Sequence, residues 1–517
     1  MRRPARITRS TVLGVTAAAL AVCSAIALPA GAAGDSGAIG FAPPQYIDQQ
    51  IGGGEPTIFY DPVHKLYVYT AHEGTTHTLV ADGVTAPQAD ADWTTNYRNQ
   101  VNIWTSRDAQ TWTRTSLDGT GFTSNPANNT GFSDPDIAQD ESGRIYNTGI
   151  DLVNDALYSS PDGGKTWDTG TPQCHEGDRP WLAAGPPNTV WLATDPSTAN
   201  GHTIYESTDG GASCNQTGIE DDPGTGKLFY DDVKGSALYG ALIEPVDHGT
   251  GKTVGISVLP SAVDAFAGNA PATFTVHTIP DYTYSGHNEH WASISLDTAG
   301  NVYLTWDDTG GSATNESIYL SMTKDGGQTW TAPLQVAHPG TTVMWPWVAA
   351  GTPGNASVVY YQYDQPLTSI SGAPDTAKMS VMNSNVLGLD SGSPSIYTAD
   401  AAGRPVHLGA QCTGGTGCEA TGDDRRLGDY FTNWIDPNGC AIIATGDTMV
   451  NDGISGQARP WSLPLFLHQD SGPSVTGGTC GVVGPALAEA PWAAGLPLAA
   501  FLGFAAVLLH RRRRAAA

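Results

Sequence analysis

Acidic and basic side chains that could take part in chemistry recur beside short apolar segments spread over most of the chain. Arginine holds carboxylates through paired N–H donors, and neighbouring carboxylic acids divide the roles of proton donor and acceptor, so a cluster of both suits acid–base catalysis or anion binding. No single stretch contains such a cluster, so the fold has to assemble it. The candidate set is Glu55, Asp134, Asp136, Asp178, Arg179, Asp231, Asp232, Glu289, His290, Arg425, Arg426 and Asp429.

Short sequence motifs that by themselves would indicate a catalytic or binding site are incomplete or absent in this chain. The run from Gly249 to Thr253 ends like a phosphate-binding loop, but Val246 stands where its first glycine belongs. No G-x-S-x-G elbow occurs, and the histidines on either side of Glu289 lack the H-E-x-x-H spacing of a zinc site. We therefore expect no metal and no cofactor. For each residue of the candidate set, a hydrogen bond or salt bridge between neighbouring elements is the competing explanation.

A short turn motif recurs along the chain and organises it. The stretch 160–167 reads SPDGGKTW; 323–330 reads TKDGGQTW, 207–214 reads STDGGASC, and 106–112 reads SRDAQTW, which is one residue short. Asp-Gly-Gly is a tight-turn signal, because the aspartate accepts bonds from backbone N–H groups ahead of it and the glycines adopt positive φ without strain. Each copy therefore predicts a β-hairpin, with its terminal tryptophan packed on a neighbouring strand.

The pattern Ser/Thr-x-Asp-x-Gly-x-Thr-Trp resembles the Asp box, or BNR repeat, of sialidases and their relatives. The resemblance covers roughly residues 50–470. It implies an all-β fold, a β-propeller, with the boxes on the outer rim of its blades. Non-catalytic propellers also carry Asp boxes, so the motif indicates architecture more than chemistry.

Seven repeating units predict seven blades, with six as the alternative because the unit at Leu228 has no Asp box. Each unit places a polar residue before an apolar strand, a turn and a second apolar strand, and such units form four-stranded blades. Inner strands of a propeller converge on a channel, so we expect the candidate set to meet at one mouth. The segments 72–100 and 365–425 are expected to be rim or lid insertions. The units begin near Glu55, Asp134, Arg179, Leu228, His290, Trp345 and Asp429.

The resembled sialidases hold a sugar carboxylate with three arginines and use a tyrosine nucleophile backed by a glutamate, with an aspartate as acid. The matching tyrosines here are Tyr363 or Tyr430, backed by Glu289, and the matching acid is Asp134 or Asp136. The N-terminal Arg-Ile-Pro of that family is absent, and Glu55 lies where its arginine would fall. The substrate-binding candidates are therefore Glu55, Arg179, Arg425, Arg426 and Arg459.

The two ends of the chain read as targeting segments. Four arginines precede an apolar run and a small-residue cleavage site, which predicts a signal peptide over 1–32. An uncharged apolar stretch followed by four arginines predicts one transmembrane helix over 491–510, with the basic tail 511–517 inside the cell. Between them we expect a lead-in at 33–50, the propeller at 51–470 and a flexible tether at 471–490.

Six cysteines remain beyond the signal segment, an even number in an oxidising compartment, and they predict three disulfides. Cys214 replaces the tryptophan of one Asp box, and bridging it to Cys174 would contribute about 4 kcal/mol in the loop-entropy model. Sequence leaves the pairings open.

The formal net charge of −27 repels nucleic acid, so nucleic-acid binding is not expected. The prediction is a membrane-anchored propeller at the plasma membrane that binds or hydrolyses extracellular glycans or glycoconjugates, with exo-sialidase as the specific enzyme hypothesis. The alternative is a non-catalytic propeller that acts as an adhesion or protein-binding platform.

Overall fold

The computed structural model describes residues 38–72, 101–115, 117, 131, 133–150, 154–168, 171–175, 177–195, 201–220, 226–247, 253–286, 292–310, 316–415, 417–450 and 461–481. All of them belong to one compact unit, 37–517. The predicted signal peptide, membrane helix and basic tail lie outside these ranges, as do Glu289, His290, Arg459 and the predicted insertion 72–100 apart from His72. The predicted tether lies outside them only beyond residue 481. Its first part is wrong as a flexible segment, because residues 471–473 end one strand (Leu463–Pro473) and Thr479–Cys480 form another. Over the ranges given, no helix has the length and apolar character needed to cross a membrane.

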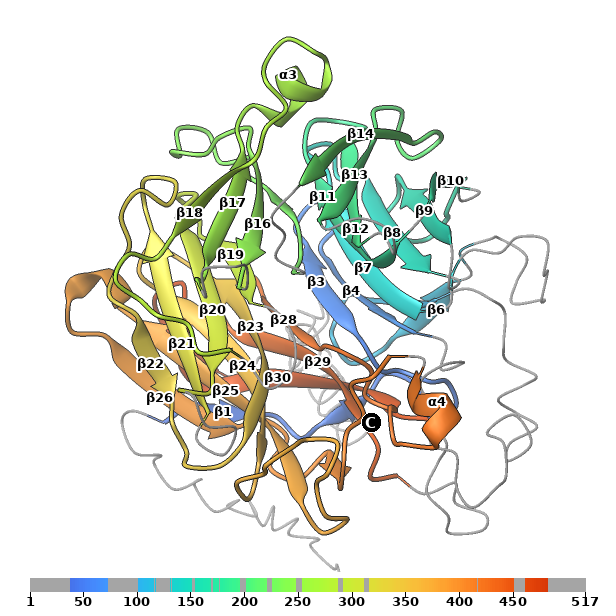
Figure 1. Cartoon of the computed structure of the whole chain (residues 1–517). Helices are drawn as coiled ribbons and strands as arrows, with labels where there is room; N and C mark the ends of the chain where they lie inside the picture. The colour runs from blue at the N-terminus through green and yellow to red at the C-terminus, as the bar shows by residue number, and fades with distance from the viewer. Residues whose placement is uncertain are drawn as a thin grey trace, which may run out of the picture. The chain divides into compact units, whose positions relative to one another are not determined.

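The described residues form seven antiparallel sheets, numbered here as blades 1 to 7 (Figure 1). Blades 1 to 3 consist of β3 (Thr57–Asp61), β4 (Leu66–Ala71), β5 (Asn102–Ser106) and β6 (Thr113–Thr115); β7 (Ser133–Gln139), β8 (Ile145–Ile150), β9 (Asn154–Ser160) and β10 (Thr171–His175); and β11 (Asp178–Ala184), β12 (Val190–Asp195), β13 (His202–Ser207) and β14 (Asn215–Glu220).

Blades 4 to 6 follow one another in chain order, like blades 1 to 3. The helices among the described residues are three short turns. The strands are β15 (Phe229–Tyr230), β16 (Leu242–Val246), β17 (Gly255–Leu259) and β18 (Thr275–Thr278); β19 (Ser293–Leu296), β20 (Val302–Asp308), β21 (Ser317–Thr323) and β22 (Leu334–Ala337); and β23 (Val343–Ala350), β24 (Ala356–Tyr363), β25 (Lys378–Leu387) and β26 (Ser395–Asp400), with β27 (His407–Leu408) beside β25. The helices are α3 (Ala262–Phe266), η1 (Leu389–Ser391) and α4 (Gly417–Thr421).

Blade 7 joins the two ends of the described chain. It is built from β28 (Thr432–Ile435), β29 (Ala441–Asp447), β30 (Leu463–Pro473) and the N-terminal β1 (Gly40–Phe41), while β2 (Gln45–Tyr46) and β31 (Thr479–Cys480) also pair with β30. Each blade contacts the next, and β28 contacts β3, so the sheets close into a ring. The fold is a seven-bladed β-propeller, and the unit at Leu228 is blade 4.

Apolar side chains fill the spaces between successive blades, because each sheet is hydrophobic on both faces. Ile103 of blade 1 and Ile145 of blade 2 share one buried cluster, and Ile256 of blade 4 and Leu304 of blade 5 share another. A buried ion pair adds a polar link: Lys227, just before β15, donates to the carboxylate of Asp136 in blade 2 and to the carbonyl of Leu182 in blade 3. Three blades are thus tied beside the channel.

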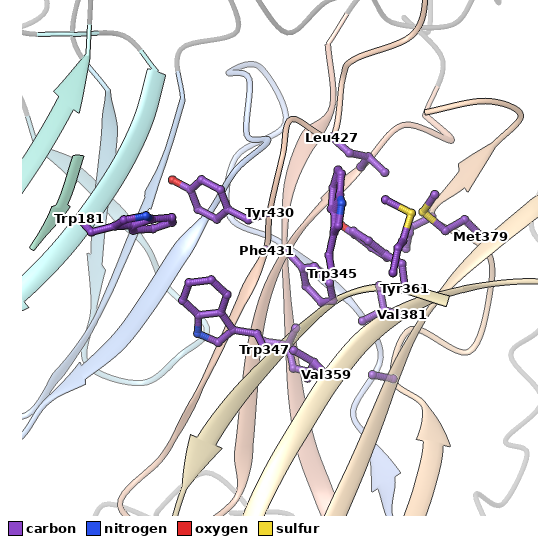
Figure 2. Close-up of a cluster of buried hydrophobic side chains, with 14 of the residues drawn as sticks. Trp181, Trp345, Trp347, Val359, Tyr361, Met379, Val381, Leu427, Tyr430 and Phe431 are labelled. Carbon is purple, nitrogen blue, oxygen red and sulfur yellow. The ribbon is translucent and has the colours of Figure 1, made fainter. Parts of the chain in front are cut away.

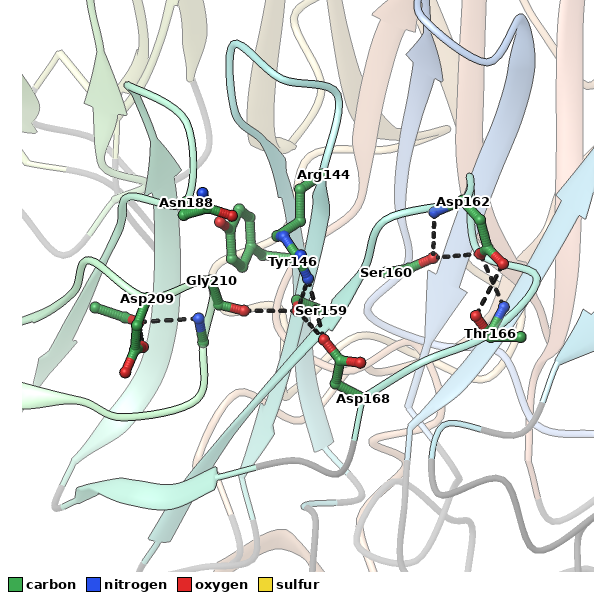
Figure 3. A network of polar contacts seen from close by, with 12 residues as sticks. Arg144, Tyr146, Ser159, Ser160, Asp162, Thr166, Asp168, Asn188, Asp209 and Gly210 are labelled. Carbon is green, nitrogen blue, oxygen red and sulfur yellow. Dashed lines mark hydrogen bonds and ion pairs between the residues drawn. The ribbon is translucent and has the colours of Figure 1, made fainter.

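The four Asp boxes lie in the hairpin between the third and fourth strands of blades 1, 2, 3 and 5. In blade 2, Asp162 accepts hydrogen bonds from the backbone N–H of Thr166 at 2.9 Å and from its hydroxyl at 2.8 Å (Figure 3). Trp167 packs, partly buried, on the cluster between blades 1 and 2. The predicted hairpin is confirmed.

Each box turn also docks on the preceding blade. Gly163 of the blade 2 box has a φ of +75°, and a Cβ added there would lie 2.9 Å from Cβ of His64 in blade 1. Gly210 of the blade 3 box accepts a 2.6 Å hydrogen bond from the hydroxyl of Ser159 in blade 2 (Figure 3). The box glycines are therefore needed for their conformation and for the close approach of two blades.

Three disulfides are present, as predicted, and Cys174 is bonded to Cys214, so a covalent bridge stands where that Asp box lacks its tryptophan. The others join Cys412 to Cys418 and Cys440 to Cys480. The prediction for 365–425 was wrong in part, because β25 and β26, the outer strands of blade 6, lie within it.

Replacing Gly163 by alanine should lower the free energy of unfolding by about 2–4 kcal/mol, because the left-handed conformation and the contact with His64 both add cost. Gly268 is the matched control, since it has the same φ of +75° and open space around it. Its alanine variant should lose only about 1–2 kcal/mol. Urea unfolding of both variants measures the difference, and equal losses would contradict docking between blades.

Candidate functional site

The first strands of four blades begin with the same unusual backbone. Glu55, Asp134, Arg179 and Trp345 have φ values of 46°, 51°, 54° and 56°, and each is followed by proline. In blades 2, 3 and 6 the strand register shifts at this point, which marks a β-bulge. Non-glycine residues in this conformation cost roughly 1–2 kcal/mol each, and bulges of this kind re-aim side chains next to functional sites.

Three carboxylates from blades 1, 2 and 7 meet where the first strands begin, an end of the channel that we call the upper mouth. Glu55 Oε1 accepts a 3.0 Å hydrogen bond from the backbone N–H of Asp429, and its Oε2 accepts one of 3.3 Å from the hydroxyl of Ser133. Ser133 is also 2.6 Å from Oδ1 of Asp134. Glu55 is fully buried, whereas Asp134 and Asp429 keep 7% and 6% of their surface exposed.

Crowding of these carboxylates favours their neutral forms. Burial, followed by the charge of Asp429, raises the pKa of Glu55 to about 7, against a lowering by Arg425. Burial and the charges of Glu55 and Asp178 raise the pKa of Asp134 well above its ordinary value. Both shifts favour protonated carboxyl groups at the upper mouth, and a carboxylic acid in that state can act as a proton donor.

Two arginines offset part of this negative charge. Arg425 donates to Asp429 at 2.7 Å and lies 3.8 Å from Glu55, with only 6% of its side chain exposed. Arg179 lies 3.5 Å from Asp195, and 22% of its side chain is exposed. The neighbouring Asp178 is exposed to solvent. Arg179 and Asp178 are therefore the charged groups of the cluster that a ligand reaches first.

An aromatic layer crosses the channel beside this cluster. Trp181 of blade 3, Trp347 of blade 6 and Tyr430 before blade 7 lie side by side (Figure 2). Their ring centroids are 5.0 Å apart for Trp181 and Tyr430 and 5.8 Å for the two tryptophans. Blades 3 and 6 are separated by two blades in the ring, so their side chains can meet only through the channel. The three rings separate its two ends.

Beyond the aromatic layer, first strands from all seven blades line a cavity of about 550 Å³. It leads to the other end of the channel, the lower mouth, where the first strands end. Aspartates follow several of these strands and cap the next turn; Asp297, for example, accepts from the backbone N–H groups of Ala299 and Asn301. Asp231 caps such a turn as well. Its predicted place beside the upper-mouth residues is therefore wrong.

The structure brings six candidates together at the upper mouth: Glu55, Asp134, Asp178, Arg179, Arg425 and Asp429. Asp136 lies only two residues beyond Asp134, but its carboxylate pairs with Lys227 in the wall between blades. Arg426 is buried against Asp424, at 2.6 Å. These two residues have structural partners that account for their burial.

The two tyrosines proposed as nucleophiles are both buried. Tyr430 donates its hydroxyl to the carbonyl of Pro135 at 2.8 Å, and burial raises its pKa well above the ordinary value. Tyr363 donates to the carbonyl of Gly409 at 3.0 Å, and burial raises its pKa too. Within the ranges described, no group of three or more His, Cys, Asp or Glu side chains is placed to hold a metal ion.

Ser133, Lys227 and the aromatic layer were missed at the sequence level. A residue-proline pair before an apolar strand, repeated four times, was visible and would have found Ser133 beside Asp134. Lys227 offers no such signal, because its partners are about 45 and 91 residues away in the chain.

No protein-family model matches the chain, and no curated protein matches it. Among solved structures it is similar to a leech intramolecular trans-sialidase, with 12% identity over 84% of this chain and 69% of the other and a TM-score of 0.37. It is also similar to YCF48 from Cyanidioschyzon merolae, with 11% identity over 82% of this chain and 98% of the other and a TM-score of 0.41. An α-L-arabinanase from Penicillium chrysogenum has 11% identity over 84% of this chain and 97% of its own, with a TM-score of 0.38. Values this low carry no argument, and the fold follows from the strand pairing of the chain itself.

Replacing Glu55 by glutamine should make stability less dependent on pH. The folded-state pKa of Glu55 is raised from 4.5 to about 7, so its contribution to stability is fully present below pH 4.5 and is lost as the pH rises to 7. The wild-type protein should therefore lose roughly 1–3 kcal/mol between pH 5 and 8 that the variant retains. Urea unfolding at both pH values measures this, with the exposed Glu141→Gln as control. Equal losses of stability between pH 5 and 8 in all three proteins would contradict the raised pKa of Glu55.

Proposed function

We propose that the upper mouth is the active site of a glycoside hydrolase in which Asp134 is the general acid. The observation that carries this proposal is the carboxyl group of Asp134, which is held against Glu55 through Ser133 and keeps 7% of the residue surface exposed. The raised pKa of Asp134 supports it. Cleavage of a glycosidic bond needs a carboxylic acid that stays protonated near neutral pH, so that it can protonate the leaving oxygen.

A glycosidase also needs a second, ionised carboxylate. Asp178 is solvent-exposed beside Arg179, and its charge is among those that raise the pKa of Asp134. Glu55 is fully buried, so it acts as a positioning residue that keeps the proton on Asp134. Different surroundings thus give the two aspartates different roles.

The proposed substrate is a neutral glycan. The resembled sialidases hold a carboxylated sugar with three arginines, whereas two of the three described candidates here, Arg425 and Arg426, are nearly buried and paired with Asp429 and Asp424. Arg179 keeps 22% of its side chain exposed, against 6% for each of the other two. A single arginine among several carboxylates attracts a carboxylated sugar poorly.

The proposed place of action is outside the cell. The three disulfides support an oxidising compartment, because such bonds are rare where thiols are kept reduced. Anchoring through 491–510 remains part of this proposal, on the sequence pattern given above.

A protein-binding platform is the second candidate. The pairing of Arg425 and Arg426 within the protein favours it, because residues committed to internal ion pairs have a structural role that requires no substrate.

Asp134→Asn should lower the turnover of any neutral aryl glycoside that the protein cleaves by about 100- to 10,000-fold, because the leaving oxygen then lacks its proton donor. The assay is fluorophore release from a panel of neutral aryl glycosides and one aryl sialoside. Asp375→Asn, an exposed aspartate in blade 6, is the control and should keep full activity. No turnover of any neutral glycoside by the folded wild-type protein would reject the hydrolase and favour the platform.

A further inference from the structure

The cavity behind the lower mouth has the features of a binding site of its own. It opens between exposed residues such as Pro62, Asp232 and Pro437. Its volume of about 550 Å³ lies within the range of small-molecule sites. The layer of Trp181, Trp347 and Tyr430 separates it from the carboxylate cluster, so a ligand here would not touch the upper mouth.

Partly exposed aromatic residues line the cavity on two opposite sides, with their rings packed against neighbouring blades. Tyr60 of blade 1 and Trp434 of blade 7 come from neighbouring blades, while Phe229 and Tyr230 come from blade 4 across the channel. Tyr230 is held rigidly by stacking on Trp191, at 5.0 Å between centroids and 26° between planes. A ligand entering between these sides meets the parts of these rings that the blades leave exposed, and rings fixed in this way bind at little cost in conformational entropy.

Charge in the cavity disfavours an anion. Its lysine, Lys227, already donates to Asp136, Ile137 and Leu182, which accounts for its three N–H groups. Asp297 and Asp436 are occupied as turn caps, and Asp232 at the rim adds a negative charge. No cation of the lining is thus left for an acidic ligand.

The polar groups that remain are mainly backbone groups. Each first strand pairs with one strand only, so within the described residues its channel edge has no strand partner. Some of these edge groups bond within the protein: the N–H of Ile58 donates to Thr432, and the carbonyl of Leu182 accepts from Lys227. The other edge groups are N–H donors and carbonyl acceptors. A purely apolar ligand would remove them from water without replacing their hydrogen bonds. Sugar hydroxyls both donate and accept, and the C–H faces of a sugar ring pack on aromatic side chains.

We infer that the lower mouth is a second ligand site, which binds the end of a neutral saccharide between Tyr60 and Trp434 on one side and Phe229 and Tyr230 on the other. Asp232 accepts hydrogen bonds from sugar hydroxyls at the rim. The inference concerns binding only and does not require hydrolysis at the upper mouth.

The test is fluorescence polarisation with labelled neutral trisaccharides of glucose, galactose, mannose and arabinose, and with sialyllactose. The full chain is used, both native and carrying Asp134→Asn. At least one neutral probe should bind both forms alike. Tyr230→Ala and Asp232→Ala should each weaken that binding roughly three- to tenfold, and Tyr230→Phe, which keeps the ring, should leave it within about twofold. Tyr239→Ala removes an exposed tyrosine outside the lining and should have no effect.

The unfolding midpoint of each variant shows whether weaker binding reflects a loss of folding. If Tyr230→Ala does not fold, the binding of Asp232→Ala tests the inference, because Asp232 is exposed and its replacement should not disturb folding. Binding of no neutral probe at millimolar concentration would overturn the inference. So would binding that Asp134→Asn abolishes and the lower-mouth variants leave intact, since that ligand would sit at the upper mouth. Tighter binding of sialyllactose than of its neutral counterparts would overturn the ligand class. Each of these results is independent of whether the protein cleaves glycosides.

Discussion

Ring closure is the interaction on which the rest of this structure depends. Seven sheets enclose a channel only if the first and last are joined, and here the N-terminal β1 completes blade 7 by pairing with β30. Tyr46 strengthens the join, because its hydroxyl donates to Asp447 at 2.6 Å beside Arg404. Glu55 and Asp429 are 374 residues apart, and their contact at the upper mouth exists because blades 1 and 7 are neighbours.

Several features of the upper mouth destabilise the folded protein, and interactions elsewhere in the ring have to offset their free-energy cost. Left-handed residues before proline, a fully buried glutamate and crowded carboxylates all destabilise the folded state. Arg425, the hydroxyl of Ser133 and the backbone N–H of Asp429 recover part of that free energy by binding the carboxylates. The rest is offset by apolar packing between blades and by the covalent bridges. Such concentration of strain and desolvation is typical of sites whose geometry serves function.

Much of the architecture could be predicted from sequence because each blade repeats local signals. The Asp boxes mark hairpins, and the polar residues before apolar strands mark all seven blades, including the one without a box. The sequence also predicted that Glu55, Asp134, Arg179 and Arg425 would meet at one mouth. Each of them lies at or just before the start of a first strand. Prediction failed where the outcome depends on three-dimensional neighbours. Asp136 follows a bulge and pairs with Lys227 from another blade. The outer strands of blade 6 were hidden in a segment rich in small and polar residues.

The aromatic layer across the channel has a consequence for how a polymer could be handled. Trp181, Trp347 and Tyr430 narrow the channel with rings that pack on one another. All three side chains are almost fully buried, so they leave little of their surface to a ligand from either mouth. The layer therefore favours binding of the end of a chain at one mouth over threading of a chain through the channel.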